Sequence, residues 1–122
     1  MKTTILFTTL IILCIIIFTA CSKSSTTKDG GAGITFSCTG ISPTFSGDVQ
    51  PILNTVCSIN SNCHASGTIN FGGPLTNFAE VNAQKADIRA QILSGAMPQN
   101  TSISQSQINA FICWIDSGAP NN

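Results

Sequence analysis

The hydrophobic residues of this chain follow two patterns along its length. From Ile5 to Phe18 they form one apolar run. From residue 34 onward they recur at intervals of three and four, which is the spacing of one face of an α-helix. Between these regions, residues 21–33 hold no large apolar side chain and are rich in Ser, Thr and Gly, which is typical of a flexible tether. The pattern predicts a leading segment, a tether and one domain over residues 34–122.

The first predicted helix lies just before Cys57. Its expected buried face consists of apolar residues at offsets of three and four: Val49, Ile52, Leu53 and Val56. Asp48 is expected to cap this helix, with Pro51 in the first turn, where the missing N–H costs nothing. Cys57 is therefore predicted near the helix end, with the following cysteine on the next turn.

A second helix is predicted over residues 82–94, and Gly95 is suited to end it. Its expected buried stripe consists of Ile88, Ile92 and Leu93. A short helical turn starting near Thr76 is expected before it, with Phe78 and Val81 facing inward.

The last helix has the clearest signals. Ser104 and Gln107 match a capping box, and Ile103 and Ile108 occupy the hydrophobic-staple positions around it. Its expected buried face consists of Ile108, Phe111, Ile112 and Ile115. Gly118 can end the helix.

No alternating apolar and polar run is long enough to predict a strand. The fold class is therefore predicted to be all-α, with three to four short helices, long loops, and the first and last helices packed together. The chain has 122 residues, 8% of them charged, and a formal net charge of +0. Its size excludes a multidomain enzyme, and without a basic field we expect no nucleic-acid partner. So small a folded unit often needs a disulfide, metal or cofactor.

The leading segment has the features of a bacterial export signal. Lys2 gives it a positive start, and its apolar run is too short to span a bilayer comfortably. The run ends at Phe18-Thr19-Ala20-Cys21, which resembles a lipobox, the motif whose cysteine becomes the acylated first residue. We expect residues 1–20 to be a signal peptide and Cys21 to be lipidated. An ordinary secretory signal or a weak anchor helix is the alternative.

Lipidation would anchor the tether, residues 21–33, to a membrane surface, since each buried methylene contributes about 0.8 kcal/mol. Ser22 and Lys23 follow Cys21 with no early acidic residue, which favours the outer membrane over the inner one. The expected location is the cell envelope, as an outer-membrane lipoprotein.

The six cysteines fall into two groups. Cys14 leaves with the signal peptide and Cys21 is used for lipidation. The cysteines left in the folded domain are Cys38, Cys57, Cys63 and Cys113. An even number in an oxidising compartment suggests disulfides, and four cysteines allow three pairings. A disulfide between Cys57 and Cys63 is one of the open alternatives.

Cys63 is followed directly by His64, the only histidine of the chain. A cysteine pair that ends in Cys-His is typical of c-type haem attachment, in which two thiols bind the porphyrin and the imidazole binds iron. Here five residues separate Cys57 from Cys63, whereas the usual gap is two. A zinc site that adds a further cysteine is possible by ligand type, but oxidising chemistry disfavours it. A single histidine and scattered acidic residues make a substrate-converting enzyme the least favoured interpretation.

Met97 is the only methionine left after export, and it stands in the sequence Gly95-Ala96-Met97-Pro98. Pro98 biases Met97 towards an extended conformation. This placement could direct the thioether to the second axial position of an iron.

Together these residues resemble small class I-like cytochrome c domains of bacterial envelope lipoproteins, in particular the planctomycete-type group of Bacteroidetes-like lipoproteins. The resemblance covers roughly residues 45–120. Its matching pieces are Asp48-Val49-Gln50-Pro51-Ile52-Leu53, Cys57…Cys63-His64, Gly95-Ala96-Met97-Pro98 and Cys113-Trp114-Ile115-Asp116-Ser117-Gly118-Ala119-Pro120.

The resemblance implies one covalently bound haem c, attached through Cys57 and Cys63, with His64 as proximal and Met97 as distal iron ligand. Such His/Met ligation generally raises the reduction potential and suits an electron carrier rather than an enzyme, acting with an envelope redox partner. The long gap must bulge out if both thiols are to reach the haem. Single-thioether attachment and a haem-free descendant of the fold remain alternatives.

The resemblance leaves Cys38 and Cys113 outside the haem motif, and we expect them to pair. This disulfide would close a loop of about 75 residues, worth roughly 4 kcal/mol in the chain-entropy model. Trp114 is expected to pack against the domain's own apolar surface or against the porphyrin. The competing hypothesis is a haem-free lipoprotein module with two disulfides, used for binding or assembly.

Overall fold

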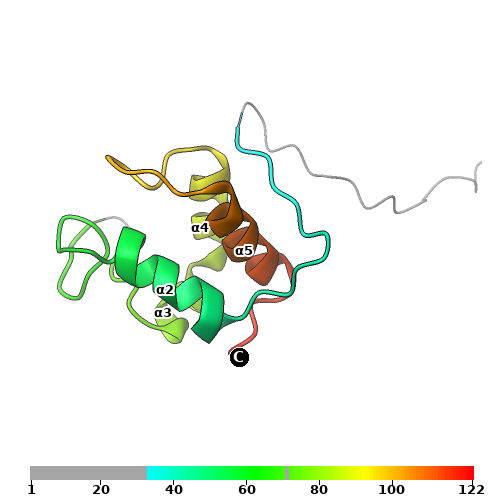
Figure 1. Cartoon of the computed structure of the whole chain (residues 1–122). Coiled ribbons are helices and arrows are strands. Elements are labelled where there is room, and N and C mark those ends of the chain that lie inside the picture. Colours follow the sequence, from blue (N-terminus) through cyan, green and yellow to red (C-terminus); the bar gives the residue numbers. More distant parts are fainter. Residues whose placement is uncertain (1–32, 71) are drawn as a thin grey trace, which may run out of the picture.

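The computed structural model describes residues 33–70 and 72–122 (Figure 1). All regular structure in this part of the chain is helical, which confirms the predicted all-α class. The elements are η1 (Phe45–Val49), α2 (Gln50–Ile52), η2 (Leu53–Cys57), α3 (Phe78–Ala83), α4 (Lys85–Leu93) and α5 (Gln105–Asp116). The expected signal peptide, Cys21 and nearly all of the expected tether lie outside the described residues. No helix of the described part of the chain is long and apolar enough to cross a membrane.

The first helix runs without interruption through η1, α2 and η2, and it begins before the predicted start. Thr44 is the N-cap, and its hydroxyl accepts a hydrogen bond from the Gly47 amide at 3.1 Å. Asp48 was expected to be the cap, but it lies inside the first turn. Its carboxylate accepts hydrogen bonds from the Thr44 amide and hydroxyl at 2.7 and 3.1 Å. The two side chains thus satisfy the helix end reciprocally, which moves the cap four residues earlier.

Wide π-type turns lie on both sides of α2, the segment that contains Pro51. The proline lacks an N–H, and in a regular α-helix its ring clashes with the carbonyl four residues earlier. The wide turn that starts at Thr44, whose carbonyl accepts from the Val49 amide at 3.2 Å, precedes this position. A π-type widening gives the ring more room than a regular α-turn, so the helix continues through Pro51 to Cys57.

The range predicted for the second helix, residues 82–94, covers the end of α3 and all of α4. The chain breaks at Gln84 (φ −112°, ψ 10°), so α4 begins at Lys85 instead of residue 82. The turn expected near Thr76 is the complete helix α3, capped by the Asn77 side chain, which accepts from the Glu80 amide at 3.1 Å. The inward-facing residues are as predicted: Val81, Ile92 and Leu93 are buried, and Phe78 and Ile88 are half-buried against the core.

Helix α5 follows its sequence signals closely. The Ser104 hydroxyl accepts from the Gln107 amide at 3.3 Å, and the Gln107 side chain accepts from the Ser104 amide at 2.9 Å. The predicted capping box is therefore confirmed. Gly118 has a φ of +105°, the left-handed conformation that glycine adopts after a helix.

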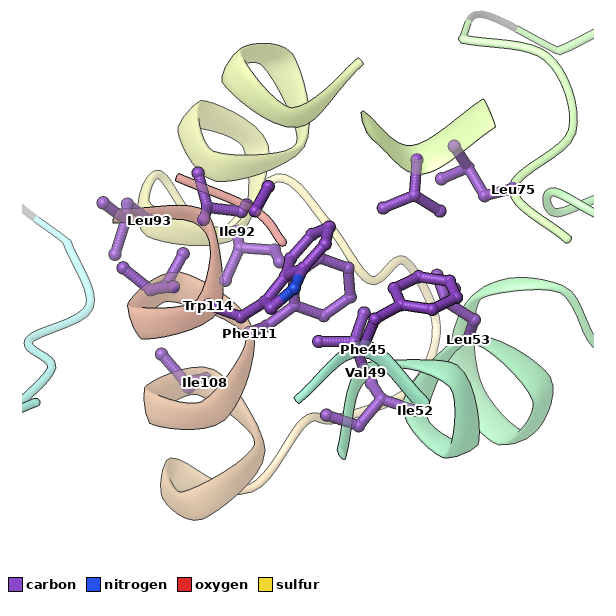
Figure 2. Close-up of a cluster of buried hydrophobic side chains, with 14 residues drawn as sticks. Phe45, Val49, Ile52, Leu53, Leu75, Ile92, Leu93, Ile108, Phe111 and Trp114 are labelled. Carbon is purple, nitrogen blue, oxygen red and sulfur yellow. The ribbon is translucent and has the colours of Figure 1, made fainter. Parts of the chain in front are cut away.

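Trp114 is at the centre of the core, where α5 packs against η1 (Figure 2). The indole is fully buried, and its ring centroid lies 5.5 Å from that of Phe45 and 6.2 Å from that of Phe111. Its Nε1 donates to the carbonyl of Pro120 at 2.8 Å, so the one polar atom of the ring is satisfied. Trp114 therefore packs against the domain's own aromatic side chains, and the predicted contact between the first and last helices is present.

The segment before η1 is fastened to α4 and α5. Cys38 and Cys113 form a disulfide with a Cα–Cα distance of 5.5 Å, which is the pairing expected above. The Ile34 amide donates to the Leu93 carbonyl at 3.1 Å. Figure 1 shows this segment (cyan) running beside α5 on the side opposite the loop that follows η2.

Candidate functional site

The residues of the Cys…Cys-His motif lie at the end of η2 and in the loop that follows it, drawn green in Figure 1. Cys57 is the last residue of η2 and packs, half-buried, against the core. Cys63 and His64 are half-buried in the loop. Both cysteines are free thiols, so the alternative disulfide between them is not formed in this structure.

The helix ends at Cys57, and the five residues between the two cysteines form bends and turns that bring the His64 amide back to the helix end. The His64 amide donates to the Cys57 carbonyl at 2.9 Å. In an α-helix this bond joins residues four apart, the separation that the first cysteine and the histidine have when only two residues lie between the cysteines. Here the same bond joins residues seven apart, with residues 58–62 forming an excursion. The longer gap therefore keeps the backbone contact of the shorter motif.

The excursion is itself hydrogen-bonded. The Asn60 carbonyl accepts from the amides of Cys63 and Ala65 at 3.1 and 3.2 Å. The Ser58 hydroxyl donates to the Leu75 carbonyl at 2.6 Å. These bonds give the loop one defined path between the two cysteines.

Three hydrogen bonds hold His64. Its amide donates to the Cys57 carbonyl, and its carbonyl accepts from the Leu75 amide at 2.9 Å. Its Nδ1 lies 2.8 Å from the carbonyl oxygen of Gly73. A carbonyl oxygen only accepts, so Nδ1 carries the proton, and in the neutral imidazole Nε2 then carries a lone pair. Nε2 makes no hydrogen bond to a described residue. A histidine whose other ring nitrogen donates to a backbone carbonyl is the arrangement that metal-ligating histidines adopt.

Glycine residues make this arrangement possible. Gly72 has a φ of +89°, and a Cβ at this position would lie 2.9 Å from Oε1 of Gln84 and 3.7 Å from Cε1 of His64. The left-handed backbone at residue 72 favours glycine, whereas a Cβ there would make only an ordinary van der Waals contact with the imidazole. Sequence analysis missed Gly72 and Gly73. The adjacent glycine pair before a proline was the signal that could have drawn attention to them.

Burial, and secondarily the proximity of Cys63, raises the pKa of the Cys57 thiol to about 11. At neutral pH this thiol is therefore uncharged.

The described residues contain no group of three or more His, Cys, Asp or Glu side chains that could hold a metal ion. Cys38 and Cys113 are joined to each other, so neither can be the fourth ligand of the alternative zinc site.

Met97 lies on a different loop, between α4 and α5. It is half-buried, and its amide donates to the Gln91 carbonyl at 3.1 Å, just after Gly95 turns the chain with a φ of +74°. No hydrogen bond between described residues joins this loop to the one that carries His64. The structure therefore joins the backbones of Cys57 and His64, with Cys63 next to the histidine, and it leaves Met97 as a separately positioned candidate.

No protein-family model, curated protein or solved structure matches this chain. The functional argument therefore depends on the local geometry of the cysteines and of the histidine.

Proposed function

We propose that this domain is a lipid-anchored, monohaem c-type protein that carries electrons in the cell envelope. The observation that carries the proposal is the orientation of His64. Its Nδ1–H is bound to the Gly73 carbonyl at 2.8 Å, and its Nε2 makes no hydrogen bond to a described residue. Two free thiols precede it in the chain, Cys57 at the end of η2 and Cys63 directly before His64.

The donor set fits covalent haem. The thiols of Cys57 and Cys63 would hold the porphyrin by adding across its two vinyl groups, with each thiol hydrogen going to the adjoining vinyl carbon and no oxidant consumed. Nε2 of His64 and the thioether of Met97 would bind the iron. The bound haem supplies a one-electron iron couple, whose potential the axial ligands adjust.

We infer electron transfer rather than catalysis from the number of axial ligands. If His64 and Met97 both bind the iron, no coordination position is open to a substrate. The redox partner then exchanges electrons without a bond being made at the metal.

The proposed location is the cell envelope, with Cys21 lipidated and the membrane reached through the acyl chains. The disulfide between Cys38 and Cys113 supports an oxidising compartment, because such bonds are rare in the cytosol. The order Lys2, apolar run and lipobox-like ending at Cys21 supports export and anchoring.

Intact mass under denaturing conditions tests the proposal after expression with a cytochrome maturation system. We expect one haem to remain attached to each chain. The double variant Cys57→Ala/Cys63→Ala should lose it, whereas Cys38→Ala, which removes a cysteine outside the motif, should retain it. Wild-type protein without any added haem mass would contradict the proposal. A second disulfide in that material would favour the haem-free binding or assembly module.

A further inference from the structure

The backbone of Cys63 is held by side chains from later in the same loop. Its carbonyl oxygen accepts from the Thr68 hydroxyl at 2.8 Å and from Nδ2 of Asn70 at 3.3 Å. In a two-residue gap the regular ladder of the helix would hold the second cysteine. Here the excursion at residues 58–62 interrupts that ladder, and these side-chain bonds take its place.

Thr68 is the only polar or charged residue that counts as buried in the part of the chain that the structure describes, with 9% of its surface exposed. Its hydroxyl donates to the Cys63 carbonyl and accepts from the Asn70 amide at 3.2 Å. A buried hydroxyl is tolerated when its hydrogen-bonding capacity is satisfied in this way. The burial fixes where the hydroxyl lies, and hence where the Cys63 carbonyl lies.

Asn70 connects this cysteine to the histidine. Its Nδ2 also donates to the Asn62 carbonyl at 2.6 Å, so the amide spans the last peptide groups of the excursion. The backbone carbonyl of Asn70 accepts from the Gly73 amide at 2.8 Å. The Gly73 carbonyl in turn accepts from Nδ1 of His64. One continuous set of hydrogen bonds therefore runs from Cys63 through Thr68 and Asn70 to the imidazole.

We propose that Thr68 and Asn70 are positioning residues that hold Cys63 for attachment in spite of the five-residue gap. They keep the second thiol in register with Cys57 and His64, as the helix itself would do in the shorter motif. This inference rests on the proposed haem attachment. It goes beyond that proposal because it states how this chain compensates for its long spacing.

The direct test compares Thr68→Val with Thr55→Val. Valine has nearly the volume of threonine but lacks the hydroxyl. The Thr55 hydroxyl makes the same kind of bond, to the Pro51 carbonyl at 2.8 Å, but on the helix before the motif. For Thr68→Val we expect about fivefold fewer chains with a thioether at Cys63, the effect of losing one hydrogen bond. Thr55→Val should match the wild type, and Thr68→Ser should restore attachment.

The number of thioethers is counted on haem-bearing chains. The protein is denatured without reductant and treated with iodoacetamide, and its intact mass is measured. A haem-bearing chain with two thioethers adds no label, because Cys38 and Cys113 are joined. A chain attached only through Cys57 adds one label at Cys63.

A second background separates positioning from general stability. Deletion of residues 60–62 leaves two residues between the cysteines, so the helix can hold Cys63 directly. In this background we expect Thr68→Val to leave the thioether count unchanged. A merely structural role would lower attachment equally in both backgrounds, and that result would overturn the inference.

Asn70→Ala keeps the inference testable if Thr68→Val does not fold, because Asn70 is exposed. It should lower attachment at Cys63 in the same direction. The inference would be overturned if Thr68→Val formed two thioethers in undiminished yield. If Thr68→Val does not fold, the same result in Asn70→Ala would overturn it. Wild-type protein without covalent haem would instead refute the proposed function, so the two failures are distinguishable.

Discussion

At the scale of a single residue, one backbone carbonyl determines the tautomer of the His64 imidazole. A free imidazole has two neutral tautomers, and only one leaves Nε2 able to bind a metal. The Gly73 carbonyl selects that tautomer through the 2.8 Å contact with Nδ1.

Met97 gives the sharpest residue-scale prediction about the iron. If its thioether is the distal ligand, Met97→Ala should abolish the sulfur-to-iron charge-transfer band and lower the reduction potential. The thioethers to Cys57 and Cys63 should remain, because they do not depend on the distal ligand. Visible spectroscopy and redox titration of the matured protein check both effects. A band that survives in Met97→Ala would show that another group binds this face.

Glu80 gives a pH prediction. Its carboxylate accepts from the Thr76 amide at 2.7 Å, and this bond is the main cause that lowers the pKa of Glu80 below 4.5. Because the folded state favours the ionised form, its contribution to stability is present at higher pH and is lost as pH falls through the lowered pKa. The urea midpoint of Glu80→Gln should therefore fall less than that of wild type below pH 4.5.

Asp87→Asn is the matched control for Glu80→Gln. Asp87 also lies in the first turn of a helix, but it makes no hydrogen bond to another described side chain. This variant should keep the acid dependence of the wild type. Equal acid dependence in wild type and in Glu80→Gln would contradict the role given to Glu80.

At the scale of elements, α5 was predictable because its signals are local. The capping box, the staple positions and the apolar spacing all fall within residues 103–115. The start of the first helix was predicted wrongly, because the reciprocal bonds between Thr44 and Asp48 move the N-cap from Asp48 to Thr44. The break at Gln84 was missed as well, since glutamine is a good helix former and gives no breaking signal.

The capping box of α5 should have a measurable effect on stability. Ser104→Ala removes the hydroxyl that accepts from the Gln107 amide. We expect it to lower the free energy of unfolding by about 1 kcal/mol, as measured by urea denaturation. Ser102→Ala is the control, because Ser102 is exposed just before the helix. Equal midpoints for the two variants would contradict the capping account.

The candidate site was predictable only in part. The motif residues Cys57, Cys63 and His64 stand out in the sequence because thiols and imidazole carry the chemistry. Thr68 and Asn70 do not, because their contribution is to bind backbone carbonyls that the folded loop brings to them. Such contacts depend on the path of the loop, which no spacing rule describes.

At the scale of the whole molecule, the N-terminal segment and α5 are held together by the disulfide of Cys38 and Cys113. Cys38→Ala should lower the free energy of unfolding by up to about 4 kcal/mol, the chain-entropy value for so long a loop. Cys38 is exposed, so the change leaves the core intact. Chemical denaturation with and without reductant checks this, since reductant should destabilise the wild type but not the variant. A reductant effect on Cys38→Ala would assign the stabilisation to another bond.

The loops that carry the proposed iron ligands both leave the helical body at the left of Figure 1, away from the segment held by the disulfide. The disulfide thus stabilises the side of the molecule opposite these loops, and the aromatic core around Trp114 lies at the centre. The loops on the other side carry the residues that the proposal assigns to haem binding.

The visible absorption spectrum of the denatured, reduced protein, matured in an oxidising envelope, tests the central claim most directly. The account predicts the absorption bands of a haem that stays on the polypeptide when all non-covalent contacts are gone. Protein that is colourless after denaturation, although fully exported, would contradict it.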